Sequence, residues 1–213
     1  MGPDEAAEDR EFLRWYGSWA DLQPRDVAKL LAGVDAPWWI VGGWAIDAFT
    51  GEPRDHDDVD VAFFRGDLAA VHAGLSGELC IWSNLGGTLR PLKQPDDLLE
   101  GARQLWVRAD ASGPWLLDLA MTPHEGDTWI SVRDDRLRMP LDAATFRAAD
   151  GIRYLRPEIV MHLKARLRRT KDERDLSVIL PRLDHRARTW LREALTLTNP
   201  DHPWLARLEA TPG

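Results

Sequence analysis

The sequence contains a single cysteine, Cys80, in 213 residues, so the chain can form neither an internal disulfide nor a cysteine-rich zinc cluster. No apolar run approaches the roughly 18 residues that a membrane-spanning helix needs. Residues 1–12 are acidic and polar, unlike a signal peptide. These features predict a cytoplasmic protein in a reducing compartment that does not enter the membrane.

Positive charge is also scarce. The sequence has 27 Lys and Arg residues and 35 Asp and Glu residues, which gives a net charge of −8. In no segment do Lys and Arg cluster into a basic stripe. Both features argue against a nucleic-acid partner, because phosphate backbones are bound by clustered cations. A hydrophobic fraction of 44% and a charged fraction of 29% are typical of a globular protein.

The chain is long enough for one domain of ordinary size with a helical annex. After one or two helices within residues 4–33, short apolar runs and helical spacings alternate, whereas amphipathic helices follow from Pro157 onward. We therefore predict an α+β domain in residues 1–145, a joint within 142–156 and a C-terminal helical domain in 150–213. The expected strands are 36–41, 59–64, 78–83, a hairpin of 104–110 and 115–121, and an edge at 128–132; the expected helices between them are 44–49 and 67–75.

Four aspartates, at positions 55, 57, 58 and 60, precede the apolar run 61–64. Side chains alternate along a strand, so Asp58 and Asp60 are expected to project from the same side and to hold one or two divalent cations. Gly42 and Gly43 end the preceding apolar run. Glycine lets the backbone approach a ligand closely, and the positive end of a following helix favours phosphate. A solvated cluster at the edge of a strand is the alternative.

A third carboxylate, Asp118, stands alone in the apolar segment "WLLDLAM". A lone buried charge is costly unless it is paired or bound to a metal. Asp118 would complete a three-carboxylate site if its strand lies in the same sheet as Asp58 and Asp60. A structural salt bridge to Arg108 is the alternative.

Together, "GGWAID", "RDHDDVDVA", "PWLLDLAM", "LRPEIVMHLKARLRRTKDERD" and "HPWL" resemble the aminoglycoside 2″-adenylyltransferase-like family, with lincosamide nucleotidyltransferases as neighbours. This family lies within the DNA-polymerase-β-type nucleotidyltransferase superfamily. The resemblance runs from about residue 36 to residue 205. It implies a nucleotidyltransferase fold, with a mixed sheet flanked by helices and followed by a C-terminal helical bundle.

The resemblance also implies roles for particular residues. Asp58 and Asp60 match the metal-binding pair, and Asp118 matches a carboxylate that binds metal, acts as general base, or does both. Residues that match nucleotide-binding positions are Gly42 and Gly43 at the phosphates, Lys164 on a phosphate, and Arg54 and His56, which contact phosphate or order the loop. Lys164 as a solvent-facing lysine and His56 as a loop hydrogen-bonder remain alternatives.

The implied reaction transfers a nucleoside monophosphate, AMP from ATP, to a hydroxyl of a small molecule and releases pyrophosphate. Two Mg²⁺ ions would activate the hydroxyl and neutralise the phosphates. An acidic cleft would favour a polyamine acceptor such as an aminoglycoside antibiotic. Two alternatives stay open: a toxin-like enzyme that modifies a protein or tRNA, and a catalytically silent nucleotide-binding protein.

Overall fold

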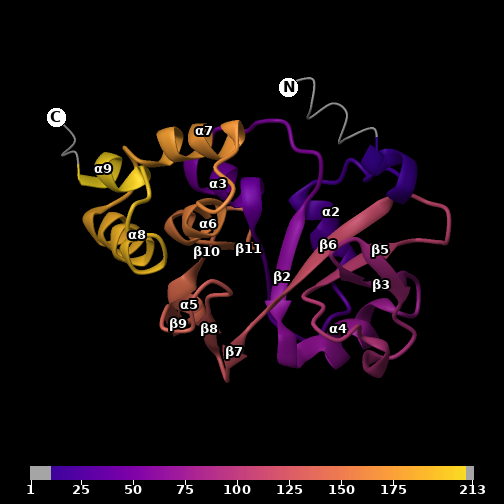
Figure 1. The fold of residues 1–213 in the computed structure, drawn as a ribbon. Coiled ribbons are helices and arrows are strands. Elements are labelled where there is room, and N and C mark those ends of the chain that lie inside the picture. Colours follow the sequence, from indigo (N-terminus) through magenta and orange to yellow (C-terminus); the bar gives the residue numbers. More distant parts are fainter. Residues whose placement is uncertain (1–10, 210–213) are drawn as a thin grey trace.

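A computed structural model describes residues 11–209 of the chain. An eight-stranded mixed sheet, in the order β10-β11-β1-β2-β6-β5-β3-β4, forms its centre, and β7, β8 and β9 form a second, smaller sheet (Figure 1). The strands are β1 (Trp38–Ile40), β2 (Asp60–Phe64), β3 (Cys80–Leu85), β4 (Thr88–Pro91), β5 (Gln104–Arg108), β6 (Trp115–Thr122), β7 (His124–Glu125), β8 (Thr128–Ile130), β9 (Arg138–Pro140), β10 (Thr145–Arg147) and β11 (Arg153–Leu155).

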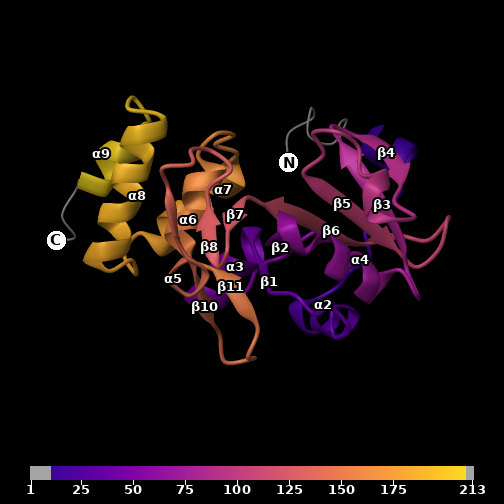
Figure 2. The ribbon, with the colours of Figure 1, turned by 90° about the horizontal axis from the view of Figure 1, so that it is seen from below.

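Some helices cover the sheet, and others lie at one end of it. Figure 2 shows α2 and α4 on one side of the sheet, and the C-terminal helices at the end opposite β3 and β4. The α-helices are α2 (Pro24–Leu30), α3 (Gly42–Thr50), α4 (Leu68–Leu75), α5 (Leu141–Ala144), α6 (Pro157–Lys164), α7 (Thr170–Ile179), α8 (His185–Thr198) and α9 (Trp204–Glu209), and the 3-10 turns are η1 (Arg65–Asp67) and η2 (Pro95–Asp97). None of the described helices is long and apolar enough to cross a membrane.

Local sequence signals explain most of these elements. Pro24 occupies the first turn of α2, where its missing N–H costs nothing. Gly51 ends α3 in the left-handed conformation, with φ of +72°. In β6, buried residues alternate with half-exposed ones, so that Leu117 and Leu119 face the core while Asp118 faces the opposite side. The predicted hairpin of β5 and β6 is confirmed.

Two expectations from the sequence need revision. The expected edge at residues 128–132 forms β8, which lies in the small sheet between β7 and β9 and not at the edge of the main one. Residues 142–156, expected as a joint, instead form β10 and β11, and β11 pairs with β1. These strands have three residues each, too few for an alternating pattern to reveal them. The part of the expected helix before residue 11 lies outside the described residues.

Candidate active site

Two carboxylates face each other across neighbouring strands. β2 and β6 are parallel, and their register places Asp60 directly beside Asp118. Residues in direct register on adjacent strands project from the same face of the sheet. Asp58 lies just before β2, two positions from Asp60. The fold therefore brings the three aspartates predicted from the sequence to one edge of the sheet.

The pKa values of all three carboxyl groups lie above the ordinary value for aspartate. Burial is the largest cause in each case. It raises the pKa of Asp58 from 3.8 to about 6, with the charge of Asp60 adding to the effect. Burial also raises the pKa of Asp60, whereas the cations Lys164, Lys171 and Arg169 oppose the rise. The pKa of Asp118 lies well above its ordinary value because of burial and then the charges of Asp60 and Asp58.

This donor set fits a divalent cation. Oxygen ligands from carboxylates are those that Mg²⁺ prefers, and a cation between these groups would relieve the repulsion that raises their pKa values. Within residues 11–209, no three Asp, Glu, His or Cys side chains already converge on one coordination point. The fit therefore rests on the chemistry of the donors and on the register of β2 and β6, not on coordination distances.

The raised pKa of Asp58 predicts a pH dependence of stability. A carboxyl that binds its proton more tightly in the folded protein contributes stability at low pH, and this contribution is lost as pH rises through about 6. In EDTA, the melting temperature of the wild type should fall relative to that of Asp58→Asn between about pH 4 and pH 6. Adding Mg²⁺ should shrink the difference. Parallel melting curves for the two proteins across this range would contradict the assignment.

Gly42 and Gly43 begin α3 at positions where a Cβ atom would meet neighbouring side chains. Gly42 has φ of +68°, and a Cβ there would collide with Oδ2 of Asp60. A Cβ on Gly43 would collide with the guanidinium of Arg54 and would lie 2.7 Å from Nδ1 of His56. The backbone at the start of this helix is therefore pressed against the carboxylate edge, where its N–H groups favour an anion.

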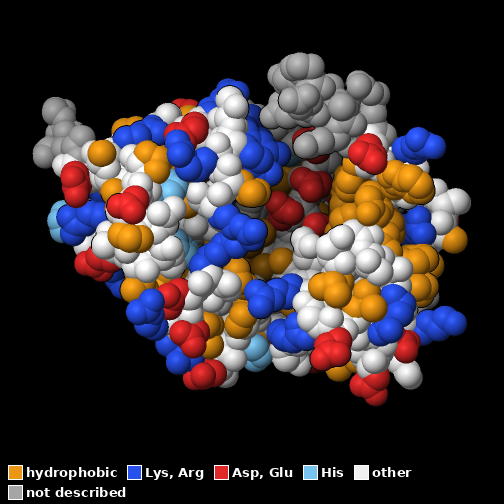
Figure 3. All heavy atoms as spheres, viewed as in Figure 1, with side chains coloured by type: hydrophobic (Ala, Val, Ile, Leu, Met, Phe, Trp, Pro, Cys, Tyr) orange, Lys and Arg blue, Asp and Glu red, His pale blue; other side chains and the backbone are white. Residues whose placement is uncertain are grey.

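These residues line a cavity of about 310 Å³. Three cationic side chains line another part of the same cavity. Lys164, Arg169 and Lys171 come from the C-terminal helices and the turn between them. Figure 3 shows the corresponding hollow, with acidic side chains inside it and Lys and Arg side chains along one border. The lining residues are Gly42, Gly43, Trp44, Arg54, Asp55, His56, Asp57, Asp58, Asp60, Lys164, Arg169 and Lys171.

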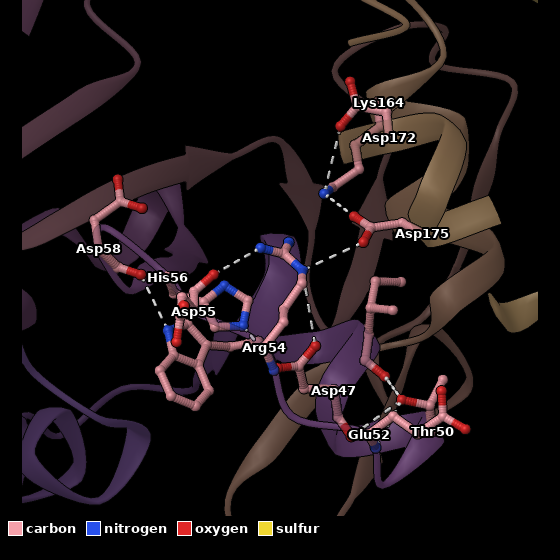
Figure 4. A network of polar contacts seen from close by, with 12 residues as sticks. Asp47, Thr50, Glu52, Arg54, Asp55, His56, Asp58, Lys164, Asp172 and Asp175 are labelled. Carbon is pink, nitrogen blue, oxygen red and sulfur yellow. Dashed lines mark hydrogen bonds and ion pairs between the residues drawn. The ribbon is translucent and has the colours of Figure 1, made fainter. Parts of the chain in front are cut away.

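Asp47, on α3, organises the loop that leads to Asp58 and Asp60. Its buried carboxylate accepts hydrogen bonds from the backbone N–H of Arg54 at 2.9 Å and lies 2.7 Å from Nε2 of His56 (Figure 4). His56 stacks on Trp44 with ring centroids 4.3 Å apart, and the Trp44 indole N–H donates to the backbone oxygen of Asp58. Arg54 and His56 thus order the loop, one of the two roles expected for them.

Asp47 is a functional residue that sequence reasoning missed, because it is a single aspartate in a short helical segment. Arg54 and His56 lie seven and nine residues after Asp47, beyond the end of α3 at Thr50, so helical periodicity predicts no contact between them. Only the return of the loop across α3 brings them together.

Lys164 is held by two buried carboxylates. Its ammonium lies 2.5 Å from Asp175 and 3.5 Å from Asp172, and its side chain is only 10% exposed. Asp175 in turn lies 3.4 Å from Nε of Arg54, so a line of ion pairs runs from α3 to α7 (Figure 4). The solvent-facing alternative for Lys164 is therefore wrong, and the lysine projects into the cavity beside Asp60.

Asp118 accepts hydrogen bonds from the side-chain amide of Gln104, at 3.2 and 3.4 Å. The alternative partner, Arg108, lies between the rings of Trp82 and Trp115 at 4.8 and 4.4 Å from their centroids. No ion pair joins Arg108 to Asp118 in the described part of the chain, so the structural salt bridge considered for Asp118 does not form.

The chain is similar in sequence to known proteins. The family model of aminoglycoside-2″-adenylyltransferase matches residues 24–84. Two proteins described as 2″-aminoglycoside nucleotidyltransferase, from Escherichia coli and Klebsiella pneumoniae, are each 45% identical over 60 residues, which is 25% of this chain and 34% of theirs. The match therefore spans about a third of these relatives' length. The residues matched by the family model include Gly42, Gly43, Asp58 and Asp60 but not Asp118 or Lys164.

A solved structure extends the likeness. The crystal structure of ANT(2″)-Ia in complex with adenylyl-2″-tobramycin superposes with a TM-score of 0.52 and 20% identity, over 81% of this chain and 97% of that one. At this identity the likeness concerns the fold alone. The resemblance and fold class predicted from the sequence are thus confirmed: the chain is similar to aminoglycoside-2″-adenylyltransferases over residues 24–84, and it has the fold of ANT(2″)-Ia.

Proposed function

We propose that the protein is a Mg²⁺-dependent nucleotidyltransferase that transfers AMP from ATP to a hydroxyl of a small molecule. The observation that carries the proposal is the pairing of Asp60 with Asp118 across β2 and β6, where Asp60 lines a cavity together with three cations. A carboxylate edge that faces lysine and arginine is suited to a triphosphate, which carries negative charge and is handled with a divalent cation.

The chain's own groups divide the work. The N–H groups at the start of α3 and the cations Lys164, Arg169 and Lys171 bind the β- and γ-phosphates and neutralise the departing pyrophosphate. Asp118 takes the proton of the acceptor hydroxyl. The acceptor oxygen forms a bond to the α-phosphorus as the bond from that phosphorus to the bridging oxygen breaks.

Asp58, Asp60 and Asp118 would hold two Mg²⁺ ions. The bound metal would supply charge neutralisation at the α-phosphate and acidify the acceptor hydroxyl. Asp47, Arg54 and His56 would act indirectly, by holding the loop that carries Asp58 in place over Gly43.

The two relatives are described as 2″-aminoglycoside nucleotidyltransferases, and the solved structure holds an adenylylated tobramycin. We therefore propose an aminoglycoside-type antibiotic as the acceptor. The remaining two thirds of those relatives' length lies outside the match, so the acceptor is the part of the proposal most in need of a direct test.

The test incubates the protein with Mg²⁺, each of the four labelled nucleoside triphosphates and tobramycin, and follows pyrophosphate release and product mass. The expected result is pyrophosphate formed with ATP and a tobramycin product heavier by one AMP. Pyrophosphate release that needs neither tobramycin nor another hydroxyl acceptor, or no release with any triphosphate, would contradict the proposal.

A further inference from the structure

Asp60 and Asp118 belong to a row of side chains across the sheet, and the next two residues in this row are tryptophans. In register, Trp106 of β5 lies beside Asp118, and Trp82 of β3 lies beside Trp106. All four side chains therefore project from one face of the sheet. Asp118 has a carboxylate on one side and an indole on the other.

Four further rings surround Trp106. Its ring centroid lies 5.2 Å from that of Trp115, 5.3 Å from Trp19, 5.6 Å from Tyr16 and 5.9 Å from Phe12. Trp106 is only 7% exposed, whereas Phe12, Tyr16 and Trp19 are half-buried and form the outer surface. We call this group the aromatic cluster: Phe12, Tyr16, Trp19, Trp82, Trp106 and Trp115.

The outer rings are fixed to the strand that carries Asp118. The backbone of Ala20 donates to Trp115 at 2.8 Å, and Trp115 donates to the backbone oxygen of Ser18 at 2.9 Å. The indole N–H of Trp115 also donates to the backbone oxygen of Tyr16 at 2.7 Å. Segment 16–20 is thus hydrogen-bonded to the start of β6, which holds Tyr16 beside the sheet.

The cluster contains buried donors that lack acceptors. The indole N–H groups of Trp82 and Trp106 and the Nε–H of Arg108 have no hydrogen-bond partner in the described part of the chain. The Trp106 indole lies close enough to Asp118 to oppose the rise of its pKa, although no hydrogen bond of normal geometry joins them. Buried donors are normally paired, and each unpaired one is costly. A purely structural core would be better served by apolar side chains.

The geometry of the proposed reaction places the acceptor on this side of Asp118. In a phosphoryl-type transfer, the attacking and leaving oxygens lie roughly in line on opposite sides of the phosphorus. The cations that would receive pyrophosphate, Lys164, Arg169 and Lys171, all come from the C-terminal helices and the turn between them, beyond β2. The attacking hydroxyl must then approach from the opposite direction, where β5 and the aromatic cluster lie.

We propose that the aromatic cluster is the acceptor subsite, and that it binds a sugar-like ring. Such a ring stacks an apolar face on Tyr16 and Phe12, and its hydroxyl and ether oxygens accept from the unpaired N–H groups of Trp82 and Trp106. The guanidinium of Arg108, held between Trp82 and Trp115, repels an ammonium group at this position. The oxygen atoms of the acceptor ring therefore face the aromatic cluster, and any ammonium groups of the acceptor point away from it. This assignment rests on the proposed transfer reaction.

The test measures binding separately from turnover. The protein, saturated with Mg²⁺ and a non-hydrolysable ATP analogue, is titrated calorimetrically with tobramycin, methyl glucoside and the matched amine, methyl glucosaminide. We expect methyl glucoside to bind more tightly than the amine. Tyr16→Ala should weaken binding of tobramycin and methyl glucoside about five- to tenfold while the affinity for the ATP analogue stays unchanged, and Tyr16→Phe should restore binding.

Trp15→Ala is the matched control, because this ring is 68% exposed on the same segment. Its ring lies against the guanidinium of Arg14 at 5.5 Å and, among the described residues, packs on no ring of the aromatic cluster. It should bind as the wild type does. Unchanged sugar affinity in Tyr16→Ala, a loss of ATP-analogue affinity instead, or no binding of any of the three ligands would overturn the subsite. Sugar binding without pyrophosphate release on addition of ATP would support the subsite while contradicting the proposed function.

Discussion

Asp60→Asn is expected to abolish nucleotidyl transfer while leaving the fold intact. Asp60 lies in register with Asp118 and beside the backbone of Gly42, so an amide there removes a metal-ligand charge at the centre of the site. We expect transfer to fall on the order of a thousandfold, or about 4 kcal/mol of transition-state stabilisation. The rate of pyrophosphate release at saturating ATP measures it.

The same change should not weaken the protein. Burial holds the pKa of Asp60 above its ordinary value, and the charge of Asp60 raises the pKa of Asp58 and Asp118. Neutralising Asp60 therefore relieves repulsion, and the melting temperature without Mg²⁺ should hold or rise. Asp96→Asn makes the same change in charge at an exposed position far along the chain and should retain full activity. A fully active Asp60→Asn protein would remove this residue from the site.

Lys164→Ala is expected to weaken both ATP binding and folding. The lysine projects into the cavity and neutralises buried Asp175 and Asp172. Loss of its charge-assisted contact to phosphate should cost about 1.5–3 kcal/mol of ATP-binding free energy. Loss of a partner from a buried ion pair should lower the free energy of unfolding by about 3 kcal/mol. Calorimetric titration with a non-hydrolysable ATP analogue and denaturant unfolding measure the two effects.

A second substitution separates these effects. In Lys164→Ala with Asp175→Asn, one buried carboxylate no longer needs a cation, so stability should partly recover. ATP affinity should not recover, because the ammonium that would meet the phosphates is still missing. Recovery of both together would mean that Lys164 acts only through the fold.

Sequence patterns anticipated the parts of the site that lie within single elements. The alternation in β6 isolates Asp118, and the apolar run 61–64 identifies β2 after the aspartates. Their meeting depends on the pairing of β2 with β6, which neither pattern contains. The resemblance to a known family supplied that link, and the register of the sheet confirms that Asp60 and Asp118 lie side by side.

Charged helix positions were harder to interpret. The segment "KDERD" has the composition of an exposed helix face, yet Asp172 and Asp175 are buried because α7 packs against α3 and α6. The aromatic cluster poses the same difficulty. Tryptophan at regular strand positions predicts core, and only the register with Asp118 relates Trp106 to the site. In both cases, tertiary packing determines the surroundings of the side chain, and the local periodicity of the sequence does not reveal this packing.

The most direct measurement of the central claim is a structure of the protein with Mg²⁺ and a non-hydrolysable ATP analogue. We expect carboxylate oxygens of Asp58, Asp60 and Asp118 to coordinate metal at about 2.1 Å. We also expect the terminal phosphates to lie against Gly42 and Lys164. Metal bound elsewhere, or an Asp118 carboxylate turned away from a metal held by the other two, would contradict the proposed metal site.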